Sequence, residues 1–272
     1  MTNTRTSRRG NMMGFSLIEL MIALVAGLIV VGSVLAFTVS SVSANSDFVK
    51  SAKLMQELRN VSNFITDELK RAGYDEAAMD YVANPSSTAV SRFAPILVDT
   101  TTATAHCIIY AYDRDPGTPG LNNRPGKIDL AQGEIRGIRR SNATVGGQVV
   151  GVVEVAESTG AVTPACNGDS PDYTQYPPAC NASSGWCPLS DPRLFNLTAF
   201  TVSTTPVTGS NGYQTIAASS GFKAMQLREM KVALAGALRS DAEIARRIES
   251  NIKVRADCLR ANVTSCSVAP AP

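Results

Sequence analysis

The feature that most constrains this chain is a long uncharged segment near its N-terminus. From Leu20 to Ser46 the sequence contains no Asp, Glu, Lys, Arg or His. As a helix rising ~1.5 Å per residue, such a run is long enough to cross the ~30 Å hydrocarbon core of a membrane. One acid, Glu19, stands directly before it. A lone acid inside a membrane costs roughly 2.5–3.5 kcal/mol at a helix centre, so the segment predicts a membrane helix whose acid has a functional partner.

The residues before this run form a short, polar and basic leader that ends at Gly14. The stretch Gly14-Phe15-Ser16-Leu17-Ile18-Glu19-Leu20 resembles the type IV prepilin motif, in which a glycine precedes an aromatic residue and a glutamate occupies the fifth mature position. The resemblance implies that prepilin peptidase cuts between Gly14 and Phe15 and methylates the new Phe15 amine. Residues 1–14 are then a cleaved cytoplasmic leader. The alternatives are a plain single-pass anchor and a secretory signal cut near Ala44, but the apolar stretch exceeds the usual ~7–15 residues of a signal core.

The same resemblance supplies a partner for Glu19. Phe15 and Glu19 are four residues apart and therefore lie on one helix face, where the helix N-terminus favours an acid. In a pilus-like stack, the Glu19 carboxylate of one subunit is expected to neutralise the Phe15 amine of its neighbour. Removing one member of such a buried pair costs about 3–5 kcal/mol.

Three arginines precede the apolar run, at positions 5, 8 and 9. By the positive-inside rule they stay in the cytoplasm, so the long C-terminal part lies beyond the membrane. We therefore expect a single-pass inner-membrane protein with a periplasmic head. Without these arginines the net charge of the remaining sequence is close to zero. The head therefore lacks the excess of positive charge that attracts the phosphate backbone of nucleic acid.

Beyond the membrane segment, taken as about residues 15–39, the helix is predicted to continue to residue 73. Apolar or small residues recur at steps of three or four, at positions 48, 52, 55, 58, 61, 65, 69 and 72. This spacing predicts one buried stripe on an amphipathic helix, and Gly73 is a natural terminator. An Asp67–Arg71 pair fits the i, i+4 spacing. The alternative is two helices that bend near Gly32 or within residues 40–46, because glycine and serine weaken helices.

Residues 74–272 change to the alternating pattern of strands. The expected strands are Ile96–Asp99, Ala105–Tyr112, Glu134–Arg139, Gln148–Val155, Leu194–Ser203, Tyr213–Ala217, Gln226–Leu234 and Asn251–Asp257. Gly146-Gly147 is expected to form a hairpin turn, and Ser240–Glu249 a short helix. The fold class is therefore α+β and type IV pilin-like, with a long N-terminal helix packed on an antiparallel β-sheet head.

The six cysteines lie in the head, in a compartment that permits disulfides. None forms a CxxC pair, so zinc and thioredoxin-like sites have little support. Cys258 and Cys266 are expected to close a small C-terminal loop. Cys166 is expected to pair with Cys180 or Cys187, and the remaining pair to include Cys107.

No catalytic or phosphate-binding motif stands out, and we expect no enzyme and no cofactor. His106 is the only histidine, and it lies beside Cys107 on a predicted strand where neighbouring side chains face opposite ways. Asp113 and Asp115 have the first spacing of a calcium loop, but no glutamate closes that loop. An ordinary turn is therefore favoured, with Asn122, Asn123 or Asp129 as the further oxygen ligands if calcium binds.

Three short stretches indicate which kind of prepilin-like protein the chain resembles. Leu69–Tyr74, Ile109–Asp113 and Leu227–Leu234 are similar to PilW-type minor pilins. The J-type minor pseudopilins of type II secretion are the related alternative. The resemblance implies a minor pilin that primes pilus assembly within a tip complex. Its partners would be other minor pilins, the major pilin, prepilin peptidase and the inner-membrane assembly platform. An adhesive role for the insertion Pro164–Pro192 is a second hypothesis, with Tyr173, Tyr176 and Trp186 exposed at a tip.

Overall fold

The computed structural model describes residues 16–76, 78, 91–114, 127–205, 224–226, 228–260 and 270. The chain divides into two compact units, Met1–Val49 and Lys50–Pro272. The cleavage residues Gly14 and Phe15 and the strand expected at Tyr213–Ala217 lie outside the described residues.

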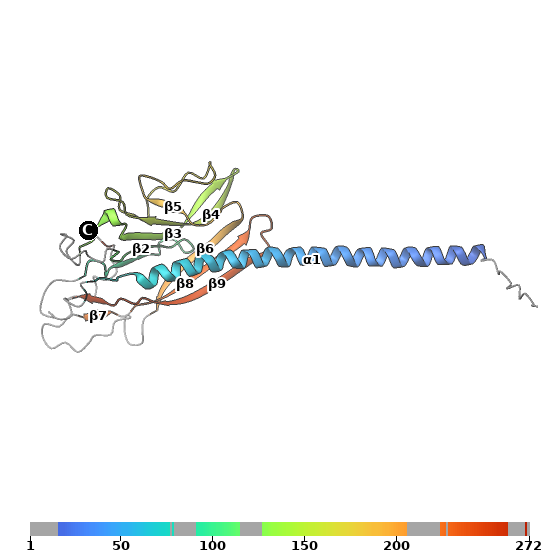
Figure 1. Cartoon of the computed structure of the whole chain (residues 1–272), viewed down its shortest axis with the longest axis horizontal. Coiled ribbons are helices and arrows are strands. Elements are labelled where there is room, and N and C mark those ends of the chain that lie inside the picture. Colours follow the sequence, from blue (N-terminus) through green and yellow to red (C-terminus); the bar gives the residue numbers. More distant parts are fainter. Residues whose placement is uncertain are drawn as a thin grey trace, which may run out of the picture. The chain divides into compact units, whose positions relative to one another are not determined.

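A single α-helix, α1, runs from Leu17 to Arg71 (Figure 1). The helix therefore continues through the Gly32 and serine positions at which a bend was the alternative. Shortly after its last residue comes the expected terminator Gly73, whose φ of 81° needs the conformational freedom of glycine. The Gly73 N–H donates to the carbonyl of Ala111, at 2.7 Å, which ties the helix end to the head.

Within the head unit, α1 buries one stripe of side chains. The buried helix residues are Leu54, Leu58, Val61, Ser62, Ile65, Glu68 and Leu69. The expected stripe is thus present from Leu58 onward, whereas Phe48 and Ala52 are exposed. The expected Asp67–Arg71 pair is replaced by two i, i+3 pairs, Asp67–Lys70 at 3.8 Å and Glu68–Arg71 at 3.5 Å.

The first sheet has five antiparallel strands in sequence order. They are β1 (Ile96–Asp99), β2 (Cys107–Ala111), β3 (Ile135–Val145), β4 (Gln148–Glu157) and β5 (Trp186–Pro188). A short 3₁₀ helix, η1 (Leu130–Gln132), precedes β3. Gly146 and Gly147 form the β3–β4 turn as expected, with φ of 61° and 77°.

Two smaller antiparallel sheets complete the head. One contains β6 (Phe195–Thr205), β8 (Glu229–Leu238) and β9 (Ala245–Lys253) in the order β6-β8-β9, and the other pairs β7 (Ala224–Gln226) with β10 (Cys258–Arg260). The expected helix at Ser240–Glu249 is wrong, because β9 begins at Ala245 and pairs along β8. Strand pairing with β8 supplies backbone hydrogen bonds that outweigh the local charge pattern typical of a short helix.

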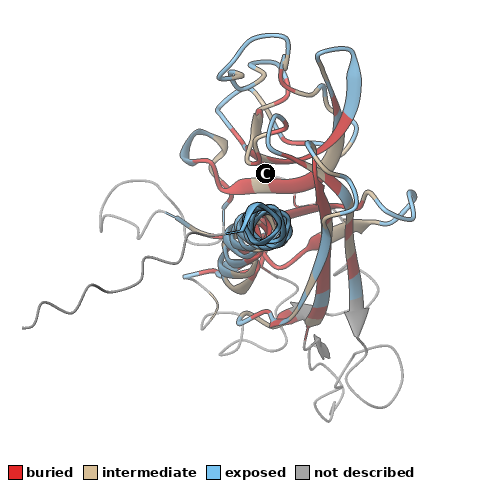
Figure 2. Cartoon of the chain, turned by 90° about the vertical axis from the view of Figure 1, so that its right-hand side faces the viewer, coloured by how far each residue is buried: buried red, intermediate tan, exposed pale blue. Residues whose placement is uncertain are grey.

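The five-stranded sheet carries a core on each face. On the side facing α1, Ile108, Tyr110 and Ile138 join Leu58 and Ile65 of the helix, together with apolar residues of β6 and β8. On the opposite face, a second cluster gathers around Trp186. Figure 2 shows the buried residues concentrated in the strands of the head. The α+β architecture with an antiparallel head is therefore confirmed.

The second core is covered by the segment between β4 and β5, which two disulfides hold in place. Cys107 on β2 is bonded to Cys166, and Cys180 is bonded to Cys187. The expectation that Cys166 pairs with Cys180 or Cys187 is therefore wrong, because Cys107 points from β2 into the second core beneath Cys166. Cys258 also takes part in a disulfide, and its expected partner, Cys266, lies outside the described residues.

Candidate assembly site

The first candidate site is the N-terminal turn of α1. Glu19 is the acid of that turn, and its neighbours Leu17, Ile18, Leu20 and Met21 are all more than half exposed. Large apolar side chains remain exposed along the helix as far as Val49. By length and composition, α1 is able to cross a membrane. A carboxylate in such an apolar setting is expensive without a positive partner, so this turn is suited to contact with another chain.

The second candidate site lies at the opposite end of α1, where the buried Glu68 joins the helix to the five-stranded sheet. Its Oε2 accepts a hydrogen bond from the Tyr110 hydroxyl at 2.8 Å and lies 3.0 Å from Arg136 Nε. The Tyr112 hydroxyl donates to the same oxygen at 3.4 Å, and Arg71 pairs with the other oxygen. A buried carboxylate of this kind is tolerated only with such a complete set of partners.

Two of the partners of Glu68, Tyr110 and Arg136, have raised pKa values that keep them in the form that donates to it. Burial, followed by the charge of Glu68, raises the pKa of Tyr110 well above its ordinary value. Burial, the largest single influence, acts to lower the pKa of Arg136, but the charge of Glu68 together with Tyr110, Tyr112 and Glu157 raises it overall. The cluster therefore fixes how α1 is rotated and translated against β2 and β3.

A second buried ion pair organises the opposite face of the sheet. Arg139 of β3 donates to Glu154 of β4 at 2.8 Å, and its guanidinium lies 4.0 Å from the ring centroid of Trp186. The same guanidinium donates to the carbonyls of Cys166 and Gly168 in the covering segment. The pair thus attaches the disulfide-bonded segment to the sheet.

The tyrosines and tryptophan of that segment differ in their exposure. Trp186 is 0% exposed, so its expected exposure at a tip is wrong; the indole N–H donates to the carbonyl of Ala165 beneath the covering segment. Tyr173 is partly buried and donates to Glu154 at 3.0 Å. Burial, followed by the charge of Glu154, raises the pKa of Tyr173. Of the three aromatic residues, only Tyr176 is largely exposed, at 53%.

The described polar residues that were candidates for catalysis or calcium binding make hydrogen bonds within the fold. His106 is buried, and its Nδ1 accepts the N–H of Val202 at 2.8 Å. Asp113 accepts the N–H of Glu76, and Asp129 caps η1. Within the described ranges, no three His, Cys, Asp or Glu side chains are grouped to hold a metal ion. Asp115, Asn122 and Asn123 lie outside those ranges, so calcium binding stays a prediction.

Sequence reasoning missed the role of Glu68. The signal was available, because Glu68 falls in the helical spacing of the buried stripe, between Ile65 and Leu69. An acid at such a position predicts a polar partner on the facing strand. Tyr110 of β2 and Tyr112, just beyond the end of β2, alternate onto one face and could have been matched to it.

A long apolar helix with an acid in its first turn, continuing into an antiparallel β head, defines a pilin-like, membrane-anchored class of protein. The sequence model of the family described as prepilin peptidase-dependent protein B, PpdB, matches residues 47–254. The chain therefore belongs to this family, whose members are structural proteins that depend on prepilin peptidase. No curated protein and no solved structure matches the chain. The match supports a pilin-like protein without favouring the PilW type in particular.

Proposed function

We propose that this protein is a minor pilin that takes part in type IV pilus assembly, as a PilW-like subunit of a tip complex that primes the pilus. The observation that carries the proposal is the position of Glu19 in the first turn of an exposed apolar helix, in a chain whose head belongs to a prepilin peptidase-dependent family. Its role is structural and not enzymatic. Its partners are other minor pilins, the major pilin and the inner-membrane assembly platform.

In this proposal the protein first spans the inner membrane, with its head in the periplasm. Prepilin peptidase removes residues 1–14 and methylates the amine of Phe15. The subunit then leaves the membrane by entering the pilus, where Glu19 pairs with the terminal amine of a neighbour. The apolar surface of residues 17–49 is covered first by lipid and then by other subunits, which explains why its side chains are exposed in the single chain.

Processing is tested by mass spectrometry of the mature N-terminus in purified membranes. We expect a chain that begins with N-methylated Phe15. A chain that begins after Ala44 would show that the segment is a secretory signal, and one that still begins with Met1 would show that the leader is not processed.

Assembly is tested by Glu19→Ala, with Asp67→Ala as a control that removes an exposed acid from the same helix. The Glu19 variant should enter the membrane at the normal level, because losing an acid favours insertion. It should nevertheless be lost from sheared pili, or piliation should fall, while the Asp67 variant behaves as the unaltered chain. Normal incorporation of the Glu19 variant would contradict the pairing.

A minor pseudopilin of a type II secretion system is the second candidate, because the same helix and head serve both machines. Deleting the gene separates the two: lost pili with normal secretion supports the pilus, and the reverse supports secretion.

Adhesion through the exposed Tyr176 is a third candidate. It requires that Tyr176→Ala abolish surface attachment while pili remain normal in number.

A further inference from the structure

Two hollows on the head meet at Arg193. The first, of about 230 Å³, lies between the head portion of α1 and the ends of β6 and β8, and its lining includes Lys50, Lys53, Glu57 and Leu194. The second, of about 410 Å³, extends from Arg193 toward the β3–β4 turn. Because Arg193 lines both hollows, they lie next to each other on the head, and we treat them as two parts of one binding surface. We call it the Arg193 groove.

The centre of the Arg193 groove is held rigid. Asp191 accepts the backbone N–H of Arg193 at 2.9 Å and pairs with its guanidinium at 3.1 Å. The Tyr176 hydroxyl donates to the same carboxylate at 2.8 Å, and the guanidinium lies over the Tyr176 ring. Hydrogen bonds from Arg193 and Tyr176 hold the pKa of Asp191 below its ordinary value, although burial acts to raise it. A surface arranged in advance loses little side-chain entropy when a partner binds.

The two ends of the groove differ in chemistry. The second hollow is lined by Val145, Tyr173, Tyr176, Pro178 and Pro192, and is therefore mainly apolar and aromatic. Rigid tyrosines and prolines of this kind favour an extended segment that presents apolar or proline side chains.

At the other end, positive charge predominates around an apolar floor. Lys50 and Lys53 contribute two cations to the lining of the first hollow, against the one acid Glu57, and the guanidinium of Arg193 is already paired with Asp191. Leu194 is 40% exposed in this hollow. Charge complementarity there favours an acidic side chain on the partner, beside an apolar contact with Leu194.

We propose that the Arg193 groove binds an extended acidic segment of another pilus subunit. An acid of that segment lies against Lys53, and an apolar residue or proline lies between Tyr176 and Pro178. This inference rests on the proposed function, because it assigns the surface by which the head selects a neighbour. It is separate from the Glu19 contact, which every subunit with the same motif can make.

The occupant is identified by photocrosslinking in piliated cells that express the full chain. A benzophenone amino acid replaces Leu194 in the groove, and a matched control replaces the exposed Tyr74, which does not line the groove. Mass spectrometry of the crosslinked peptide should find a non-helical segment of a different pilus subunit that contains Asp or Glu, from the Leu194 position only. A peptide from a second copy of this chain, a helical segment, a segment without an acid, a glycan, a lipid, or no adduct at all would each overturn the proposal.

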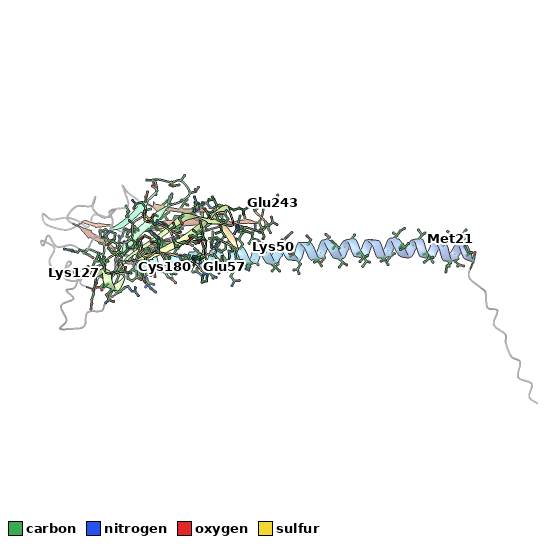
Figure 3. All side chains as sticks on the ribbon, turned by 90° about the horizontal axis from the view of Figure 1, so that it is seen from above. Met21, Lys50, Glu57, Lys127, Cys180 and Glu243 are labelled. Atoms are coloured by element: carbon green, nitrogen blue, oxygen red, sulfur yellow. A yellow bond between two sulfur atoms is a disulfide. The ribbon has the colours of Figure 1, made fainter. Side chains whose placement is uncertain are left out.

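A charge test uses Lys53→Glu and the matched Lys127→Glu. Both lysines are exposed, and Figure 3 shows Lys127 at the opposite end of the head from Lys50. Lys53→Glu should lower the crosslink yield from position 194 about tenfold, which corresponds to about 1.4 kcal/mol, while Lys127→Glu leaves it unchanged. Equal yields in both variants would contradict the role of charge. Normal processing at Phe15 with no crosslink would overturn the groove alone, whereas an unprocessed leader would overturn the proposed function itself.

Discussion

At the scale of single residues, the head depends on two buried carboxylates that serve opposite faces of one sheet. Glu68 reaches from α1 to Arg136 on the helix side, whereas Glu154 pairs with Arg139 on the other side. Each carboxylate also accepts a tyrosine hydroxyl, from Tyr110 and Tyr173 respectively. Because a buried charge without its partner is costly, each cluster specifies one arrangement of the elements it joins.

We expect Glu68→Gln to lower the free energy of unfolding by about 2 kcal/mol. The amide keeps an acceptor for Tyr110 but removes the charge that compensates the mostly buried Arg136. The full cost of breaking a buried pair, about 3–5 kcal/mol, is reduced here because Arg136 also contacts Glu157. Urea unfolding of the full chain in detergent micelles, followed by the fluorescence of Trp186, measures the change.

The control for this variant is Asp67→Asn, which removes an exposed acid one residue earlier. Its pair with Lys70 lies at the surface, so the expected change is within about 0.5 kcal/mol. Equal destabilisation by the two variants would show that Glu68 does not fix the helix against the sheet.

Prediction from the sequence fails at the residue scale wherever the partner is distant along the chain. The sequence predicts an exposed Trp186 in the insertion between Pro164 and Pro192, yet the ring lies under Arg139, which belongs to a strand two earlier in the chain. The position of Glu68 in the buried stripe indicates that it needs a partner, but only the fold shows that the partners are Tyr110 and Arg136. Local composition indicates that Trp186 lies in a connecting segment and Glu68 in a helix. It does not indicate which residues of other strands pack against them.

At the scale of elements, the two described disulfides contribute to the covering segment in different ways. The Cys107–Cys166 bond joins β2 to that segment across 59 residues, whereas Cys180–Cys187 spans only 7. In the chain-entropy model the longer loop contributes about 4 kcal/mol and the shorter about 2 kcal/mol. The first bond is therefore expected to be the main restraint on the cover of the second core.

Replacing both cysteines of a pair by serine tests this order. Cys107→Ser with Cys166→Ser should destabilise the head by about 2 kcal/mol more than Cys180→Ser with Cys187→Ser. The first variant should also shift the emission of Trp186 to longer wavelength, because the carbonyls of Cys166 and Gly168 no longer hold Arg139 over the ring. An equal or reversed order of stabilities would contradict the assignment.

Elements with strong periodicity were predictable, and elements that depend on pairing were not. The spacing of apolar residues predicted α1, and the glycine pair Gly146-Gly147 predicted the β3–β4 turn. Residues 240–249 carry early acids and late arginines, which is typical of a helix, but β8 offers β9 a continuous row of backbone partners. No local sequence pattern indicates this pairing, so residues 240–249 are predicted as a helix although β9 begins at Ala245.

At the scale of the whole molecule, the two units depend on different surroundings for their stability. Residues 17–49 expose apolar side chains in every direction, and their backbone hydrogen bonds are all internal to the helix. In lipid or detergent no water competes for those bonds, so the helix persists without a packed core. The head unit instead depends on burying its two clusters, which urea opposes in proportion to the surface exposed.

We therefore expect urea to unfold the full chain in detergent micelles in two separate stages. Trp186 is the only tryptophan and lies in the second core, so its fluorescence follows the head alone. After that transition is complete, circular dichroism at 222 nm should retain the helical signal of residues 17–49, which is lost only when the micelles are removed. Loss of the whole helical signal together with the fluorescence change would show that the apolar helix needs the folded head, and that the two units are not independent.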